Sequence, residues 1–164
     1  MALDDAEREE LETLRAERAI QRVMLAYAHG VDGCDFERVR DCFHPDAEVS
    51  WGDWYQGGRD EAIAWLEETM PRLESTLHVF GPPWIEVDLA SGTAQCETYA
   101  INSARYPPDA EGGSVQNVAG TRYVDRFEKR DGCWRIASRH NERVWVQNTR
   151  DDVAEPPADG RSAQ

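Results

Sequence analysis

Apolar residues recur at steps of three and four in the N-terminal part of the chain, which predicts an amphipathic helix over about residues 5–31. Asp35 is placed to cap a short second helix that includes Phe43 and ends before Pro45. A short strand is expected at 47–51, and apolar residues on one face predict a third helix over about residues 59–73.

After Ser75 the pattern changes to stretches rich in β-branched and aromatic residues, which are typical of strands. Turns join the first pair and the last pair of these strands as hairpins, and a polar loop joins the middle pair. Helices followed by consecutive hairpins predict an α+β fold: a cone-shaped roll in which a curved antiparallel sheet packs on the three N-terminal helices and leaves a hollow. The four predicted long strands cover residues 76–88, 93–106, 115–130 and 133–146.

The chain of 164 residues has the size of one domain. We assign residues 1–149 to a single α+β domain. Residues 150–164 contain Pro156-Pro157 and end in small polar groups, which predicts a disordered polar C-terminal tail.

The excess of acidic residues disfavours negatively charged macromolecules as binding partners. The chain has 32 acidic and 18 basic residues, and its net charge of −14 repels phosphate groups. Neither a nucleic acid nor an anionic membrane is therefore an expected partner. No apolar run approaches the roughly 18 residues of a membrane span, and the acidic start lacks the basic and apolar segments of a signal peptide. A cytoplasmic protein is expected.

The sequence offers no recognisable site for a metal or a cofactor. Its four cysteines are widely spaced without a C-x-x-C pair, and its four histidines do not cluster with them. It also lacks a P-loop, a G-x-G-x-x-G and a G-x-S-x-G. We therefore expect reduced thiols, no metal site, no cofactor and no serine-hydrolase chemistry.

Several local strings occur in a characteristic order over about residues 15–147: Ala19-Ile20-Gln21, Tyr27, Val31-Asp32, Phe43-His44-Pro45-Asp46-Ala47, Gly58, Thr76-Leu77-His78, Gly120-Thr121-Arg122-Tyr123-Val124-Asp125, Asp131-Gly132-Cys133-Trp134-Arg135-Ile136 and Ser138-Arg139. Their order and spacing resemble the SnoaL-like branch of the nuclear transport factor 2-like superfamily. The resemblance implies the cone-shaped fold. The superfamily includes dehydratases, isomerases, dehydrochlorinases, hydrolases, cyclases and binding modules, so the fold alone does not name a reaction.

The chain is most similar to members that use an aspartate–histidine pair: the bile-acid dehydratases, scytalone dehydratase and hexachlorocyclohexane dehydrochlorinase. Asp32 and His78 stand where those enzymes carry the pair. Tyr27 matches a tyrosine of the bile-acid enzymes, and Arg139 matches an arginine of the dehydrochlorinase. The resemblance also implies that no metal or organic cofactor is used, and that the protein is a homo-oligomer, a dimer or trimer formed through the outer sheet face.

His78 and Asp32 are the expected catalytic pair. An imidazole can take a proton near neutral pH, and a carboxylate on its other nitrogen fixes its tautomer and orientation. The local sequence alone leaves alternatives open. Asp32 could be a turn residue at the end of the helix beside Gly33, and Tyr27 could be a core aromatic rather than a phenolic acid or hydrogen-bond donor.

Arg139 and His140 are neighbours on a predicted strand, so their side chains should point to opposite faces. The resemblance favours Arg139 in the hollow, where it would stabilise developing negative charge. His140 has the same period as Trp134 and Ile136, which favours His140 instead. Asp125 is expected to be an exposed, structural strand residue.

Aromatic residues are expected to form part of the pocket wall and to favour a flat, apolar ligand. The candidates for substrate binding are Trp51, Tyr55 and Trp84, with the amide of Asn117 as an orienting group and His140 as a further contact.

These residues together predict a cofactor-independent lyase of the dehydratase type. His78 would remove a proton from carbon, and water would leave from the adjacent carbon of a small, apolar, hydroxylated substrate of aromatic or polycyclic character. One alternative is an isomerase similar to ketosteroid isomerase, in which the same base moves a proton without a leaving group. Another is a non-catalytic module that binds a small molecule.

Overall fold

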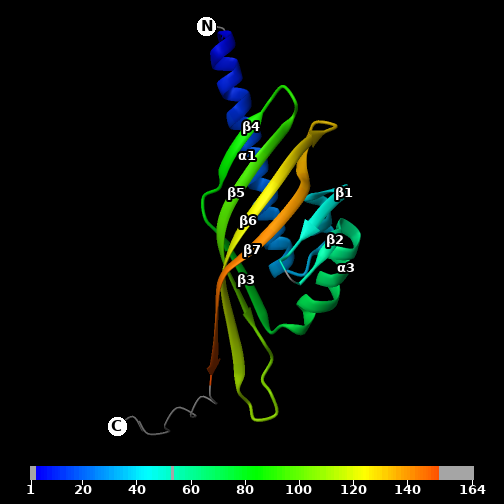
Figure 1. Ribbon diagram of the computed structural model, residues 1–164, viewed down its shortest axis with the longest axis vertical. Helices are drawn as coiled ribbons and strands as arrows, with labels where there is room; N and C mark the ends of the chain where they lie inside the picture. The colour runs from blue at the N-terminus through cyan, green and yellow to red at the C-terminus, as the bar shows by residue number, and fades with distance from the viewer. Residues whose placement is uncertain (1–2, 53, 152–164) are drawn as a thin grey trace, which may run out of the picture.

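The computed structural model describes residues 3–52 and 54–151 (Figure 1). Its helices are α1 (Asp5–Asp32), α2 (Phe36–Asp41), α3 (Arg59–Thr69) and the 3₁₀ turn η1 (Met70–Arg72). Its strands are β1 (Phe43–Ser50), β2 (Gln56–Gly58), β3 (Ser75–Phe80), β4 (Trp84–Asp88), β5 (Thr93–Arg105), β6 (Ser114–Arg130) and β7 (Cys133–Asp151).

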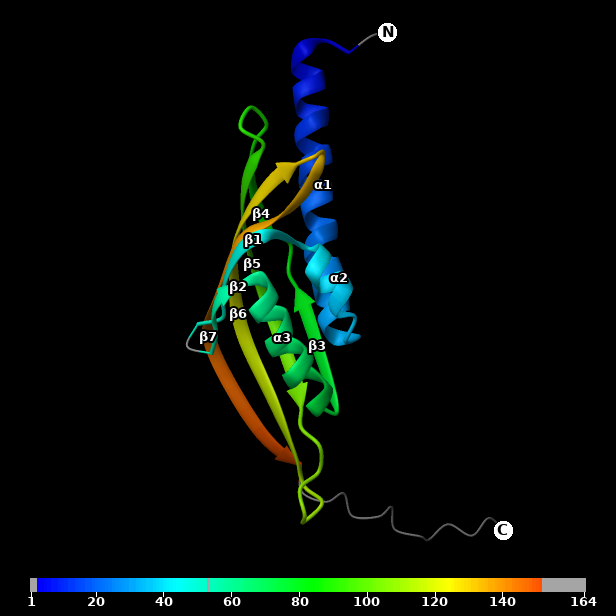
Figure 2. The same cartoon turned by 90° about the vertical axis from the view of Figure 1, so that its right-hand side faces the viewer.

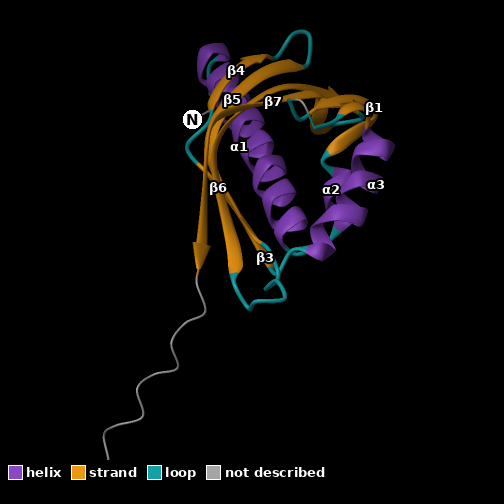
Figure 3. Ribbon diagram, turned by 60° about the horizontal axis from the view of Figure 1, so that its bottom comes forward, coloured by secondary structure: helices purple, strands orange, loops and turns teal. Residues whose placement is uncertain are grey.

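All seven strands belong to one curved sheet, and the three helices lie on its concave side (Figures 2 and 3). The order is β2-β1-β7-β6-β5-β3, and β4 pairs with the first part of β5. The α+β cone predicted from the sequence is confirmed. The sheet is mixed rather than antiparallel throughout, because β1 and β7 are not joined by a hairpin and pair in parallel.

Helix α1 positions the first candidate residue. It begins at a capping box in which Asp4 accepts from the Glu7 amide and Glu7 accepts from the Asp4 amide, both at 2.9 Å. The helix ends at Asp32, whose carboxylate reaches the backbone of β3. None of the described helices is long and apolar enough to cross a membrane. The buried stripe of α1 includes Ala16, Ile20, Met24, Tyr27 and Val31.

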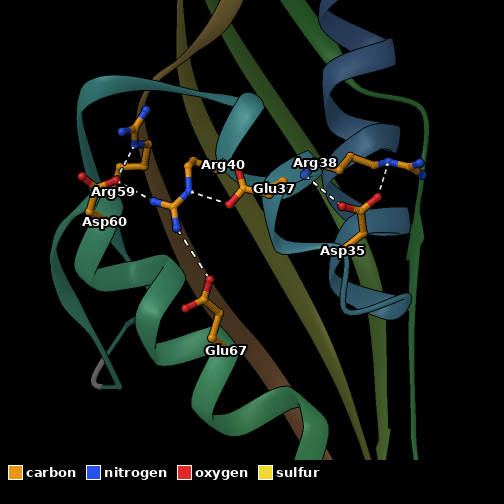
Figure 4. A network of polar contacts seen from close by, with 7 residues as sticks. All are labelled: Asp35, Glu37, Arg38, Arg40, Arg59, Asp60 and Glu67. Carbon is orange, nitrogen blue, oxygen red and sulfur yellow. Dashed lines mark hydrogen bonds and ion pairs between the residues drawn. The ribbon is translucent and has the colours of Figure 1, made fainter.

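Ion pairs connect α2 to α3, the helix that covers one side of the hollow (Figure 4). Arg40 of α2 contacts Asp60 at 2.8 Å and Glu67 at 3.6 Å, one at the start and one near the end of α3. Glu37, one turn before Arg40, contacts the same guanidinium at 3.4 Å. One arginine of α2 thus contacts α3 both at its start and near its end.

The strand predicted over residues 76–88 is wrong in one respect, because the structure divides it into β3 and β4. The intervening segment is Gly81-Pro82-Pro83. Two successive prolines lack the N–H groups that a continuous strand would donate to β5. The division separates the strand that carries His78 from the strand that carries Trp84.

The short second helix ends earlier than predicted. It stops at Asp41, and Phe43 opens β1 and pairs with Ile136 of β7. His44 and Pro45 therefore lie within a strand rather than at the end of a helix. The third helix also ends earlier as an α-helix, at Thr69, and continues as η1.

The C-terminal strand extends beyond the predicted domain boundary at residue 149. Asp151 pairs with Ser114 of β6 and contacts the Arg105 guanidinium at 2.6 Å. Residues 150 and 151 therefore belong to β7 rather than to the predicted tail. The rest of that predicted tail, 152–164, lies outside the described residues.

Candidate active site

A cavity of about 480 Å³ lies between the helices and the inner face of the sheet. Apolar and aromatic side chains form much of its wall, and His78 and several amides and hydroxyls interrupt that wall. The lining residues are Tyr27, Val31, Trp51, Gly52, Trp54, Trp65, Leu66, Met70, Leu73, Thr76, His78, Asn102, Ser103, Ala104, Asn117, Ala119, Thr121, Tyr123, Asn141 and Arg143.

Asp32 and His78 are in direct contact at this cavity. The His78 Nδ1 lies 2.7 Å from Asp32 Oδ1, and the His78 backbone amide donates to Asp32 Oδ2 at 2.9 Å. The Thr76 hydroxyl adds a longer bond of 3.4 Å to Oδ1. One carboxylate therefore contacts both the backbone and the ring of His78. The two residues come from different elements, Asp32 from the end of α1 and His78 from β3.

The protonation states of this pair follow from its contacts. Partial burial would raise the pKa of Asp32, but the hydrogen bonds from His78 and Thr76 outweigh it and hold that pKa below its ordinary value. A charged carboxylate at Nδ1 keeps the proton of the neutral ring on that nitrogen. Nε2 has no hydrogen-bond partner in the part of the chain that the structure describes, and its lone pair is free for a ligand in the cavity.

Tyr27 lies one helical turn before Val31 on the same wall of the cavity and is almost fully buried. Burial raises the pKa of Tyr27, although the nearby Arg139 cation opposes this effect. The phenol is therefore protonated at neutral pH. The ring of Tyr27 packs edge-on against Phe43 in the core, and the residue also lines the cavity. Its role as a phenolic acid or hydrogen-bond donor stays a prediction.

The structure does not place Arg139 on the cavity wall. Its side chain is 0% exposed and forms a double contact with Asp125, from Nε to Oδ1 at 2.8 Å and from Nη2 to Oδ2 at 2.6 Å. Its guanidinium carbon lies 4.1 Å from the centre of the Tyr27 ring. Arg139 thus contacts the Tyr27 ring without lining the cavity. The prediction that Asp125 is exposed is wrong, because Asp125 is buried.

A bulge in β7 explains why periodicity favoured His140. Phe127 pairs with Ile136 but Arg126 pairs with Ser138, so Ala137 is an extra residue in β7. The bulge reverses the alternation, and Arg139 rather than His140 continues the inner face after Ile136. His140 points away from the cavity, is half-exposed, and lies 3.3 Å from the Ser50 hydroxyl.

The other predicted substrate contacts divide into two groups. Trp51 and Asn117 line the cavity, and Asn117 also donates to Asn148 at 2.6 Å. Tyr55 lies behind Trp51, with ring centres 5.2 Å apart, and its hydroxyl donates to the Gly58 carbonyl. Trp84 is 71% exposed on β4, beyond the proline segment, and is not among the cavity residues.

The family model for the SnoaL-like domain matches residues 12–140, which is most of the chain. The chain belongs to the SnoaL-like domain family. The resemblance inferred from the sequence is thereby confirmed.

Solved structures agree with this SnoaL-like fold. A scytalone dehydratase-like protein from Novosphingobium aromaticivorans is 23% identical, with a TM-score of 0.73 over 91% of this chain and 97% of that chain. A type 2 hexachlorocyclohexane dehydrochlorinase is 18% identical, with a TM-score of 0.76 over 91% of this chain and 99% of that chain. The type 3 enzyme from Novosphingobium barchaimii is 19% identical, with a TM-score of 0.70 over 90% and 99%.

Sequence reasoning missed several polar residues that line the cavity of this SnoaL-like domain. Asn102 is the register partner of His78 on β5. Its position follows the buried residues Ala94, Cys96, Thr98 and Ala100 at steps of two, and this signal was available in the sequence. Asn141 and Arg143 differ in parity from Trp134 and Ile136, and they line the cavity because the bulge in β7 reverses the alternation.

Proposed function

We propose that this SnoaL-like domain is a cofactor-independent lyase of the dehydratase type. The observation that supports it is the Asp32–His78 pair, whose Nδ1 is occupied by the carboxylate while Nε2 is free at a largely apolar cavity. A module that only binds a ligand needs an apolar cavity but no oriented base. Dehydratase-like and dehydrochlorinase proteins among the structural relatives also favour an elimination.

In the proposed reaction, His78 Nε2 takes a proton from the carbon adjacent to the one that carries a hydroxyl group. The electrons of the C–H bond form a carbon–carbon double bond, and the C–O bond breaks. The departing oxygen takes a proton from the Tyr27 phenol and leaves as water. The imidazolium then returns its proton to the Tyr27 phenolate, which restores both groups.

Tyr27 is suited to the acid step because Arg139 lies behind its ring. A positive guanidinium 4.1 Å from the ring centre stabilises the phenolate that remains after proton transfer. Asp32 stabilises the imidazolium in the same interval. Arg139 therefore acts on the reaction through Tyr27 as a positioning residue, without touching the substrate.

The wall of the cavity favours a small, flat and largely apolar substrate. Trp51 and Trp65 pack with ring centres 5.3 Å apart, and Leu66 and Met70 add apolar surface beside them. An aromatic or polycyclic alcohol of modest size fits a volume of about 480 Å³.

The proposal is tested with a panel of bicyclic β-hydroxy ketones, incubated in D₂O with protein dialysed exhaustively against a chelator. We expect mass spectrometry to detect the loss of one water from at least one member, because the proposed chemistry uses only side chains of the chain itself. His78→Ala is the matched control and should leave the panel unchanged. Water loss that requires added zinc would contradict the mechanism.

The same experiment separates the alternatives. Deuterium incorporation or double-bond migration without loss of water would replace the lyase with an isomerase that uses the same base. Retention of a panel member without any exchange or turnover would favour a binding module.

We also propose that a second copy of the chain covers part of the outer sheet face. Val79, Ile101, Gly120 and Trp145 are successive register partners across β3, β5, β6 and β7, and the three large residues among them are exposed. A contiguous exposed apolar row of this kind is typical of an interface.

Sedimentation equilibrium should therefore give the mass of a dimer or trimer. Ile101→Arg should shift the protein to a monomer, because it places an unpaired charge in the middle of the row. Leu25→Arg, at an exposed apolar residue of α1, is the control and should leave the mass unchanged. A wild-type monomer at high concentration would contradict the proposal.

A further inference from the structure

The cavity contains an unusual group of buried polar atoms. Among residues 3–52 and 54–151, four buried side-chain nitrogen or oxygen atoms lack a hydrogen-bond partner. Three of them belong to cavity residues: Trp51 Nε1, Asn102 Oδ1 and Asn141 Oδ1. The fourth is Nη1 of Arg139, whose guanidinium lies against aromatic rings. Buried polar atoms without partners are rare in native proteins, so the three at the cavity point to a ligand that satisfies them.

The Asn102 amide is held in a defined orientation. Its Nδ2 donates to the Tyr123 hydroxyl at 2.9 Å and to the Thr121 hydroxyl at 3.2 Å. Both N–H groups of the amide are thereby used, and the carbonyl oxygen is what remains for a ligand. Because Asn102 is the register partner of His78, this acceptor lies beside the base.

Asn141 extends the same polar row to the next strands. It is the register partner of Tyr123, and the Tyr123 hydroxyl accepts from the Asn102 amide. Asn102 is in turn the register partner of His78, so these contacts connect the four residues across the cavity wall. Trp51 follows β1, whose last residue Ser50 pairs with His140, the neighbour of Asn141. The two free acceptors and the one free donor are therefore all on the wall that His78 shares.

The chemistry of these atoms restricts the ligand. A carbonyl oxygen requires a hydrogen-bond donor, and chlorine, an ether oxygen and a hydrocarbon supply none. A hydroxyl group supplies a donor, and its own oxygen can also accept from an N–H such as that of Trp51. We propose that Asn102 and Asn141 bind hydroxyl groups of the substrate through their amide oxygens, so that the site selects alcohols or phenols over halogenated hydrocarbons. This inference rests on the proposed lyase function and specifies its substrate class.

Equilibrium dialysis with three ligands of the same shape tests this selection: a naphthol, its methyl ether and the corresponding chloronaphthalene. Wild-type protein should bind the naphthol about 10-fold more tightly than either analogue, the size expected for one or two neutral hydrogen bonds in a buried site. Asn102→Leu and Asn141→Leu should each reduce this preference by weakening binding of the naphthol alone.

Two further variants keep the test decisive. Asn102→Asp loses the N–H donors of the amide, but its carboxylate keeps an acceptor for the ligand and can accept from the Tyr123 and Thr121 hydroxyls. It should therefore preserve the preference even if Asn102→Leu disturbs folding. Gln95→Leu, at an exposed amide on the same strand as Asn102, should bind all three ligands as the wild type does. Equal affinity of the wild type for the three ligands, or a preference that survives in both leucine variants, would overturn the proposal.

The binding result is separable from the lyase proposal. His78→Ala removes turnover in the lyase proposal, whereas Asn102→Leu and Asn141→Leu should weaken naphthol binding in the His78→Ala background as they do in the wild type, because both amide oxygens remain in place there. A preference without any water loss from the hydroxy ketone panel would remove the lyase and leave the hydroxyl-binding site intact. Water loss from the hydroxy ketone panel without a preference for the naphthol would keep the lyase and remove the hydroxyl-binding role of the two asparagines.

Discussion

Replacing His78 with alanine should lower kcat by about 10²–10⁴-fold, the range that a positioned general base contributes. The variant loses Nε2, the ring nitrogen that the contact with Asp32 leaves free at the cavity, and with it the proposed proton acceptor. The measurement is steady-state kinetics on whichever hydroxy ketone the wild type dehydrates, with circular dichroism to show that the fold is retained. An active His78→Ala protein would contradict the assignment.

Asp32→Asn should lower kcat by a comparable factor. The amide cannot stabilise the imidazolium, and it offers an N–H where the ring needs an acceptor for Nδ1–H. The double variant should be little worse than either single variant, because residues that act as a unit have strongly non-additive effects. Losses that multiply would mean that the two residues contribute separately.

Asp125→Ala should destabilise the fold by about 3–5 kcal/mol, since removal of one partner leaves a buried charge without compensation. In the wild type, burial alone would lower the pKa of Arg139, but Asp125 outweighs it and raises that pKa. The variant loses this partner, yet an arginine side chain is not deprotonated in proteins, so a buried positive charge remains. The change should appear as a lower urea midpoint at nearly constant m-value.

Two controls define what this result means. Asp46→Ala breaks an exposed contact with Arg130 and should change the midpoint far less, because water replaces the lost partner. The double change Asp125→Leu and Arg139→Met should recover much of the stability, since apolar side chains often replace a buried ion pair without loss. A small effect of Asp125→Ala would mean that water reaches Arg139.

The positions of the helices and strands could be predicted from the sequence because they depend on local patterns. Asp35 accepts from the Arg38 amide as the cap of α2, and the hairpin before Cys133 has Asp131 and Gly132 at positive φ. The boundary of β1 was missed because Phe43 is apolar and suits either a short helix or a strand. Phe43 lies in a strand because it pairs with Ile136 of β7, and the sequence around Phe43 does not indicate that partner.

The site could be predicted only in part, for a similar reason. Asp32 and His78 were placed by resemblance, since the local sequence supplies only an acid at a helix end and a histidine in a strand. Asn141 was missed because the extra residue Ala137 reverses the alternation of β7. A bulge of this kind depends on the register with β6, which the sequence of a single strand does not contain.

The parallel pairing of β1 with β7 also has a consequence for synthesis on the ribosome. Strand β1 emerges early, but its partner is the last described strand, so the edge formed by β1 and β2 cannot join the sheet until β7 has been translated. During that interval the apolar side chains of β1 lack their final cover and are open to aggregation. Trp51, which follows β1, therefore reaches its place late. Asp32 and His78 belong to α1 and β3, so they can come into contact well before the cavity wall around them is complete.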